Sequence, residues 1–506
     1  MFVREKPNAS GSVSVQVIDK SQGFRVVRTM GSSRDPVEIA RLKELGRLFI
    51  ARRGGQAELF PEDQHDNAVI LDFVRTLRNA SIRTVGPQLI FGRLFDEIGF
   101  NAIPEPLFRD IVISRLVYPT SKLKTVDYLD RYQGKTLSPD RIYSFLDRLN
   151  QRYADQARRI AYHHSRGILG AITVVFYDMT TLHFEAEDED DLRRIGFSKN
   201  GKFQHPQIML GLLVGQHGYP IGYDIFEGNT FEGKTLLPVL RRITSTYRVG
   251  RPVVVGDAAM LSQSNLRELE AEGFPFIVGA RLRNESQAVQ EEILERCQGL
   301  GNGQSAVLDR EQGQRLIVSY SEKRAKKDAH NRERGLRRLR RRIRSGRLTK
   351  SSLNQRGYNK FLRMEGQMNI SIDEQSIEQA ARWDGLKGYR TSTTLPPDEV
   401  IESYGQLWRI EKAFRISKTD LRIRPVHHYR RRRIQAHILV AFVAYTIHKE
   451  LERRLEVAGR PMSPSRAIEL TQTMYEMTFT LPDDPQPQKI LLKLDPEQQI
   501  LHELIC

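Results

Sequence analysis

Three acidic residues, Asp178, Asp257 and Glu411, have the type and the setting to act together. The aspartates end the β-branched runs "ITVVFYD" and "PVVVGD", and the glutamate lies in "YGQLWRIEKAFRISK". Carboxylates within a few ångströms of one another raise one another's pKa unless cations compensate them. Oxygen ligands suit Mg²⁺, and two such ions roughly 3.5–4 Å apart assist in-line displacement at phosphorus. The three acids therefore indicate metal-assisted phosphoryl transfer.

The segment that carries the aspartates has an α/β pattern. From residue 168, the periodicity predicts three strands, a helix, a strand, a helix and a strand. We expect Asp178 and Asp257 at the carboxyl ends of the first and fourth strands, which can be neighbours in such a sheet, and ligands gather at such ends. Strand-end aspartates also serve as caps or turn formers, so the pair alone leaves both roles open.

Glu411 lies in a predicted amphipathic helix with a mixed face. Tyr404, Trp408, Arg415 and Lys418 fall at positions −7, −3, +4 and +7 from Glu411, on one side of the helix. Glu411 would face metal, while Arg415 and Lys418 would hold the backbone of a nucleic acid. Tyr404 and Trp408 would pack beneath the nucleic acid or stack on it. The alternative is a stripe of ion pairs within the helix.

The charge of the chain favours nucleic acid as the partner. The 506 residues carry a net charge of +17, and polyanions attract such a protein. Residues 323–350 hold 14 Lys and Arg against 2 acids, and we expect them to form a helix with Leu336, Leu339 and Ile343 along one side. A solvated charge run is the alternative to phosphate contact. The predicted contacts are Arg337, Arg338, Arg340, Arg341 and Arg342, and, in "YRRRR", Arg430, Arg431, Arg432 and Arg433.

Other classes of protein are disfavoured. Cys297 and Cys506 are the only cysteines, which excludes a disulfide framework and is typical of a reducing compartment. The N-terminus lacks an apolar signal core. The apolar run at 438–447 is too short to span a bilayer and is predicted to be a buried helix. We therefore expect a cytoplasmic protein without membrane contact.

The N-terminal part is predicted to be mainly helical. Residues 12–30 alternate like a hairpin around "KSQG", and 36–52 and 86–165 favour helices. Within them, "TSKLKTVDYLDRYQGKTLSPDRIYSFLDRL" predicts two helices, with Ser138 capping the second. This pair is either a helix-turn-helix DNA reader or part of a helical bundle without a groove-entering role.

Three blocks of the sequence resemble a known family. "FYDMTTLHFE", "VVVGDAAMLSQSNL" and "YGQLWRIEKAFRISK" are similar to the catalytic blocks of DDE transposases from bacterial insertion sequences. The relevant group has a Tyr–Arg–Glu–Lys signature on its last catalytic helix. Tyr404, Glu411 and Lys418 fall at the signature spacings, whereas Leu407 occupies the arginine position. Arg409 lies on a different face of the helix, so the role of the arginine is not transferred to it.

The resemblance implies an α/β core of RNase H-like type, with a mixed sheet flanked by helices. It implies that Asp178, Asp257 and Glu411 bind two Mg²⁺ ions, for which we expect Mn²⁺ to substitute. It also implies cleavage of double-stranded DNA at terminal inverted repeats, followed by joining of the 3′-OH ends to target DNA. The working form would be at least a homodimer in the nucleoid of a bacterium. A hairpin intermediate is left open.

The predicted regions follow from these assignments, and two other functions remain as alternatives. These are a domesticated DNA-binding protein without catalysis, and a structure-specific two-metal nuclease of the same fold. The regions are 1–85 (β-hairpin and helix), 86–167 (helical DNA end-binding region), 168–280 (first part of the core), 281–398 (insertion with the basic tract), 399–460 (second part of the core) and 461–506 (C-terminal tail).

Overall fold

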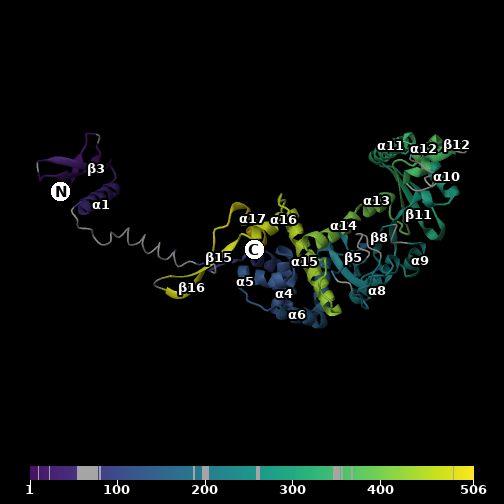
Figure 1. Cartoon of the computed structure of the whole chain (residues 1–506), viewed down its shortest axis with the longest axis horizontal. Coiled ribbons are helices and arrows are strands. Elements are labelled where there is room, and N and C mark those ends of the chain that lie inside the picture. The colour runs from purple at the N-terminus through teal and green to yellow at the C-terminus, as the bar shows by residue number, and fades with distance from the viewer. Residues whose placement is uncertain are drawn as a thin grey trace. The chain divides into compact units, whose positions relative to one another are not determined.

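The computed structural model describes the chain in two units. The described residues are 1–506 except 10, 22, 54–73, 75–77, 79–80, 186–187, 197–203, 258–261, 346–353, 355–356, 366–368 and 482–483. Unit 1 comprises Met1–Ile82 with Met477–Ile490, and unit 2 comprises Arg83–Glu476 with Leu491–Cys506. Figure 1 labels many of the elements of both units.

Unit 1 contains a three-stranded antiparallel sheet and a helix. β2 (Val13–Asp19) pairs with β3 (Arg25–Ser33) as a hairpin, which confirms the prediction for residues 12–30. β1 (Phe2–Pro7), which was not predicted, pairs with β2 on its other edge. Helix α1 (Pro36–Arg53) packs on the sheet and confirms the helix expected at 36–52.

The first part of unit 2 is helical, as predicted. α5 ends at Gly134, whose φ of +66° is the left-handed conformation that ends many helices. Ser138 occupies the N-cap position of α6, but its side chain makes no capping hydrogen bond. The helices are α3 (Gly86–Ile98), α4 (Pro106–Val117), α5 (Lys122–Gln133), α6 (Pro139–Arg148) and α7 (Ala154–Leu169).

An eight-stranded mixed sheet follows, in the order β10-β11-β14-β9-β8-β5-β6-β7. β5 is parallel to β8 and β8 to β9, while the other neighbours are antiparallel. The predicted order of strands and helices from residue 168 is confirmed. The strands are β5 (Val174–His183), β6 (Gln207–Val214), β7 (Pro220–Glu227), β8 (Val253–Gly256), β9 (Phe276–Ala280), β10 (Ser305–Asp309), β11 (Arg315–Tyr320) and β14 (Leu386–Thr391).

The two faces of this sheet pack against different helices, because successive side chains of a strand point to opposite faces. Tyr177 of β5 packs in one core cluster with α8 (Leu236–Tyr247) and α9 (Gln263–Ala271). Phe176 packs in another with α14 (Trp408–Arg415) and α15 (Arg431–Val457).

The insertion between β9 and α13 is continuous with the sheet. β14 pairs with β9, the last strand of the core, and β11 and β10 follow it. Pairing covers a strand edge whose N–H and C=O groups would otherwise lack partners. The remaining insertion elements are α10 (Gln287–Arg296), α11 (Glu322–Arg344), β12 (Leu362–Glu365), β13 (Asn369–Ile372) and α12 (Glu374–Ala381).

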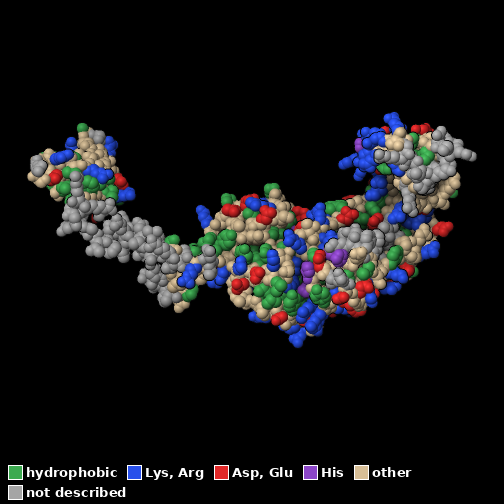
Figure 2. Space-filling model, viewed as in Figure 1, with side chains coloured by type: hydrophobic (Ala, Val, Ile, Leu, Met, Phe, Trp, Pro, Cys, Tyr) green, Lys and Arg blue, Asp and Glu red, His purple; other side chains and the backbone are tan. Residues whose placement is uncertain are grey.

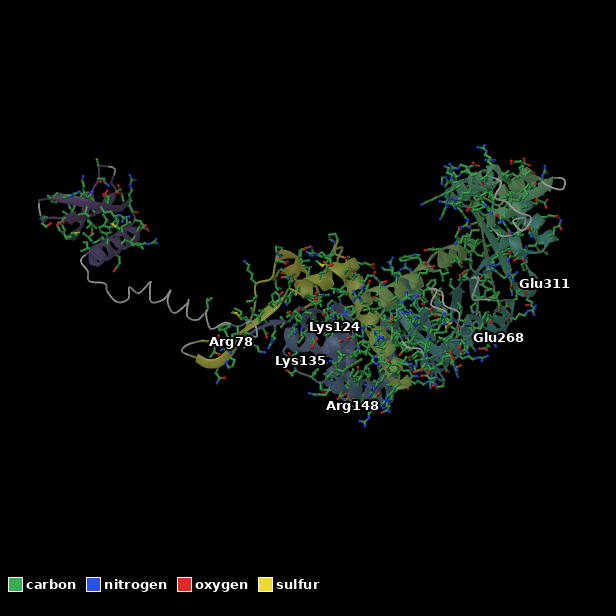
Figure 3. All side chains as sticks on the ribbon, in the orientation of Figure 1. Arg78, Lys124, Lys135, Arg148, Glu268 and Glu311 are labelled. Carbon is green, nitrogen blue, oxygen red and sulfur yellow. The ribbon has the colours of Figure 1, made fainter. Side chains whose placement is uncertain are left out.

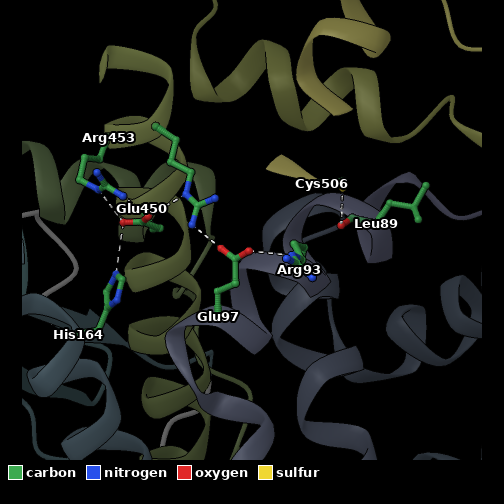
Figure 4. A network of polar contacts seen from close by, with 8 residues as sticks. Leu89, Arg93, Glu97, His164, Glu450, Arg453 and Cys506 are labelled. Atoms are coloured by element: carbon green, nitrogen blue, oxygen red, sulfur yellow. Dashed lines mark hydrogen bonds and ion pairs between the residues drawn. The ribbon is translucent and has the colours of Figure 1, made fainter. Parts of the chain in front are cut away.

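Helix α15 joins the helical part of unit 2 to the sheet. It packs against α3, α4, α6 and α7 and against β7, and its apolar run at 438–447 is buried as predicted. The buried Glu450 on α15 accepts hydrogen bonds from Arg453 and Arg454 and lies 3.4 Å from His164 of α7 (Figure 4). No helix in the described ranges combines the length and apolarity needed to cross a membrane.

Shorter elements complete the chain. They are the helices α13 (Pro397–Gly405), α16 (Pro464–Thr471) and α17 (Pro496–Ile505) and the strands β4 (Ile82–Thr84), β15 (Tyr475–Leu481) and β16 (Asp484–Leu491).

Candidate active site

The register of the sheet places the two aspartates side by side. β5 and β8 pair in parallel, with Val174 opposite Val253 and Phe176 opposite Val255. The same offset puts Asp257, directly after β8, opposite Asp178. Neighbouring strands lie about 4.8 Å apart, and residues in register point to the same face. The first and fourth strands of the core are therefore neighbours, as the sequence predicted.

One detail of this prediction is wrong. Asp178 does not end its strand, because β5 continues to His183. The continuation is paired with the antiparallel strand β6, in which Leu212 lies opposite Asp178 and Gln207 opposite His183. β8, by contrast, ends at Gly256. The aspartates thus lie where β5 passes beyond the end of its parallel neighbour.

Helix α14 brings Glu411 to the same face of the sheet. Asp178 alternates with Tyr177 and shares the face of Phe176, whose core cluster includes Ile410 and Phe414 of α14. α14 packs against β5 and β6. The structure therefore brings together the three elements that carry the predicted acids.

Tyr404 lies near both Glu411 and Asp257. Burial, together with the charges of Asp257, Tyr389 and Glu411, raises the pKa of the Tyr404 hydroxyl to about 12. A Cβ atom at Gly279 on β9 would lie 2.5 Å from the Tyr404 hydroxyl oxygen, so only glycine leaves room for this tyrosine. Tyr404 is thus a partly buried residue near two of the acids, and its nearness to Asp257 was not predicted from its spacing.

The acids fit a divalent cation by their chemistry but do not form a closed cluster. Asp257 and Glu411 are exposed and Asp178 is partly exposed, and the Met179 backbone N–H donates to Asp178 Oδ1 at 2.7 Å. Across the described ranges, no three His, Cys, Asp or Glu side chains lie close enough together to hold a metal ion. Separation is expected of like charges in the absence of cations. Carboxylate oxygens that water can reach are ligands typical of Mg²⁺.

The expectation of one continuous helix from Tyr404 to Lys418 is wrong. α13 ends at Gly405, α14 begins at Trp408, and a π-helical turn covers Ile416–Asp420. Glycine disfavours the interior of a helix by about 1 kcal/mol, which is consistent with a break at this point. Tyr404 and Lys418 therefore belong to different segments from Glu411.

The other predicted residues of this stretch have the following surroundings. Trp408 is 50% exposed, and the side chains of Arg409 and Lys412 lie 5.2 and 5.9 Å from its ring centre. Arg415 is exposed, and Lys418 Nζ lies 5.3 Å from the ring centre of Phe414. Trp408 and Arg415 are accessible to a partner, while their predicted contact with DNA stays a prediction.

A positioning contact of this helix was missed by the sequence analysis. Lys412 of α14 forms an ion pair with the buried Glu452 of α15, which also pairs with Lys449. Glu452 thereby fixes α14, and with it Glu411, against α15. The only signal in the sequence was the series of charged residues that continues the apolar run of α15.

The arginines at the start of α15 are mostly engaged within the protein. Arg432 and Arg433 both bind the carboxylate of Asp147 on α6, at 2.8 to 3.1 Å. Arg431 pairs with Asp191 at 2.9 Å, where both side chains are exposed, and Arg430 is exposed. Three of the four predicted DNA contacts therefore have a partner within the protein that the sequence did not reveal, and the DNA contacts themselves stay predictions.

The basic tract forms the predicted helix. Leu336 and Leu339 of α11 are buried, with Ile343 packed beside them. Arg337, Arg338, Arg341 and Arg342 are exposed, and Arg340 is partly exposed. Figure 2 shows lysine and arginine side chains gathered where Figure 1 places α11. Residues 346–350 of the predicted helix lie outside the described residues. The exposed arginines offer phosphate contacts that are not specific for sequence.

Comparisons with known proteins bear on the family of the chain. A search of curated proteins finds no match. A cryo-EM structure of a piggyBac transposase synaptic complex with hairpin DNA is similar over 76% of this chain and 76% of that chain, at 10% identity and a TM-score of 0.39. The family model of the transposase DDE domain matches residues 170–447, which include the two aspartates and the glutamate. Since this match spans more than half of the chain, the protein belongs to the DDE transposases.

Proposed function

We propose that the protein cleaves double-stranded DNA at the terminal inverted repeats of its element and joins the freed 3′-OH ends to target DNA. In this proposal the core is of RNase H-like type, and Asp178, Asp257 and Glu411 hold two Mg²⁺ ions. The observation that supports it is the parallel pairing of Phe176 with Val255, because Asp178 and Asp257 each follow these residues by two positions on the face that α14 covers. The metal ions would activate the attacking oxygen and stabilise the leaving one.

The rest of unit 2 supplies surfaces for DNA in this proposal. The exposed arginines of α11 bind phosphates without reading sequence, and the helices α3–α7 bind the transposon ends. Two ends must be held in one complex, so the working form is at least a homodimer. Tyr404, partly buried near Asp257 and Glu411, packs beneath the metal site and does not stack on the nucleic acid.

The test uses the full-length protein and labelled DNA that carries the two ends flanking its own gene. Cleavage at the end boundaries should require Mg²⁺ and be restored by Mn²⁺. Glu411→Gln should lower the rate by more than about 100-fold, since changing a residue that merely hydrogen-bonds a metal ligand costs roughly 10–100-fold. Glu399→Gln, which changes an exposed glutamate on α13, is the matched control and should cleave normally.

The other outcomes separate the alternatives. Binding of the ends without cleavage, identical in the wild type and Glu411→Gln, would leave a DNA-binding protein without catalysis. Cleavage of branched DNA of any sequence, with no joining to target DNA, would instead indicate a structure-specific nuclease.

A further inference from the structure

A second charged site lies between α4, α5 and the segment that follows the π-helical turn. It is a pocket of about 460 Å³. Its lining contains no aspartate or glutamate, although three different parts of the chain contribute to it. We call it the basic pocket. Its basic and histidine side chains are Arg115, Lys122, His428 and His437 in the interior and Arg422, Arg424 and His427 nearer the solvent.

The interior of the basic pocket holds basic side chains at a depth where their charged forms are costly. Arg115, Lys122 and His437 are only 5%, 6% and 5% exposed. Burial lowers the pKa of the Lys122 ammonium group well below its usual value, and the Arg115 charge lowers it further. Burial, together with the charges of Lys122 and Arg115, lowers the pKa of His428 to about 3. Buried charges in proteins are normally paired, and here the lining offers no acid.

Several polar atoms of the basic pocket have no partner among the described residues. These are Arg115 Nε, Arg424 Nη1 and His437 Nδ1. Arg115 Nη1 has one long hydrogen bond, 3.5 Å to the Leu421 carbonyl oxygen, and His437 Nε2 lies 3.0 Å from the Ile423 carbonyl oxygen. Most buried polar groups are hydrogen-bonded in native proteins. Unpaired guanidinium atoms beside a cavity therefore indicate an absent acceptor.

The N-terminus of helix α5 adds a partial positive charge to the basic pocket. Ser121, Lys122 and Leu123, the N-cap and first residues of this 12-residue helix, line the basic pocket. The first backbone N–H groups of a helix lack partners within the helix, and the helix dipole favours anions there. The basic side chains and the backbone N–H groups of the pocket thus both favour an anion as the ligand.

We propose that the basic pocket binds a phosphate group of the DNA strand. The proposal rests on the proposed function and adds a place on the protein where that DNA is held. The mouth carries the exposed Arg422 and His427, so a phosphate that is part of a chain can enter. One wall belongs to the helix pair α5–α6, and the other follows the segment that carries Glu411. A phosphate bound here therefore ties the helical region to the catalytic core.

The first arm of the test uses inorganic phosphate and the melting of unit 2. Both tryptophans of the chain, Trp383 and Trp408, lie in unit 2, so their fluorescence reports its unfolding. A ligand that binds only the folded state raises the melting temperature. Phosphate should do so more than chloride at equal ionic strength in the wild type, and should have no such effect in Lys122→Met. Without phosphate, Lys122→Met should melt at the same or a higher temperature than the wild type, because it removes a buried basic group that no acid of the lining neutralises.

The matched control is Lys124→Gln. Lys124 lies on the same helix (Figure 3), is exposed and does not line the basic pocket. It loses the same charge, so a general electrostatic effect would appear in both variants. Arg424→Gln, at a partly exposed position of the lining, serves as a second variant if Lys122→Met does not fold. Equal responses to phosphate in the wild type and in the folded pocket variant would overturn the proposal.

The second arm distinguishes DNA from a free anion. Lys122→Met should weaken binding of a duplex oligonucleotide about tenfold, as expected for loss of a hydrogen bond to a charged group, and Lys124→Gln should weaken it less. Inorganic phosphate should compete with the duplex in the wild type. Stabilisation by phosphate with unchanged DNA affinity in Lys122→Met would overturn the assignment to DNA. Neither arm needs Mg²⁺ or cleavage, so failure here is distinguishable from failure of the proposed catalysis.

Discussion

Like charges gather at two places in unit 2, and they differ in their contact with water. At the catalytic face, Asp257 and Glu411 are exposed and Asp178 is partly exposed. In the basic pocket, Arg115 and Lys122 are almost fully buried. Water screens repulsion between exposed charges, whereas a buried charge loses its hydration and is screened much less.

This difference separates two ways of preparing a site for a charged ligand. Exposed acids keep their hydration until a cation binds, at little cost to the folded protein. Buried cations are held in place by packing, and their lost hydration destabilises the folded protein until an anion binds. A buried charge that already has its partners, such as Glu450, gives the reference against which both sites can be compared.

The largest effect on stability is expected for this paired buried charge. Glu450 is 1% exposed, and its carboxylate accepts hydrogen bonds from Arg453 and Arg454 at 2.6 to 2.9 Å. Glu450→Gln should lower the free energy of unfolding by about 2 kcal/mol, because its partly exposed arginine partners lose a charged hydrogen-bond acceptor. Urea titration followed by tryptophan fluorescence measures the change. Glu456→Gln, at an exposed position of the same helix, should change it by less than about 0.5 kcal/mol.

Glu450→Gln is expected to lower the stability of the folded protein, and Lys122→Met to leave it unchanged or raise it. This difference sharpens the comparison. Both residues are buried and charged, and only their partners differ. If Lys122→Met destabilised the metal-free and phosphate-free protein as much as Glu450→Gln does, Lys122 would have a partner of its own, and the contrast between paired and unpaired charge would be lost.

The histidines of unit 2 predict a smaller effect, which depends on pH. The pKa of His428 is lowered to about 3 and that of His448 to about 4, in both cases first by burial. A histidine with a lower pKa in the folded state binds fewer protons there than in the unfolded state, whose pKa is near 6.5. Its contribution to stability is complete above pH 6.5 and is lost as the pH falls towards the folded pKa. The loss should be about 1.4 kcal/mol per pH unit for each such histidine.

The window between pH 6.5 and about 4.5 isolates this effect. Burial opposes ionisation of Glu450, but hydrogen bonds from His164, Arg453 and Arg454 lower its pKa, so its contribution is lost only at lower pH. The charges that lower the pKa of His428 belong to Lys122 on α5, Arg115 on α4, Arg433 on α15 and the adjacent His427. Urea titrations at several pH values should show a shallower dependence for His428→Gln. An unchanged slope would contradict a buried neutral His428.

Local patterns predicted the elements of the catalytic face, and long-range contacts decided the rest. Alternating and helical periodicities were sufficient for the order of strands from residue 168 and for the buried side of α11. They did not reveal that β5 continues beyond Asp178. This continuation depends on pairing with β6, which lies elsewhere in the chain. The basic pocket was also hidden, because Arg115 meets the carbonyl of Leu421 from 306 positions away. The same holds for Asp147, which binds Arg432 and Arg433 of a distant helix.

The smallest effect on the metal-free protein is expected at the catalytic face. Asp257 is exposed, so Asp257→Asn should change the free energy of unfolding by less than about 0.5 kcal/mol, as is usual for surface positions. Mg²⁺ should stabilise the wild type by mass action and should have little effect on the variant, because one ligand of the proposed site is gone. Urea titrations with and without Mg²⁺ give both quantities. If Asp257→Asn lowered the free energy of unfolding by several kcal/mol without metal, Asp257 would support the fold itself. The contrast between exposed, hydrated acids and buried cations held by packing would then fail.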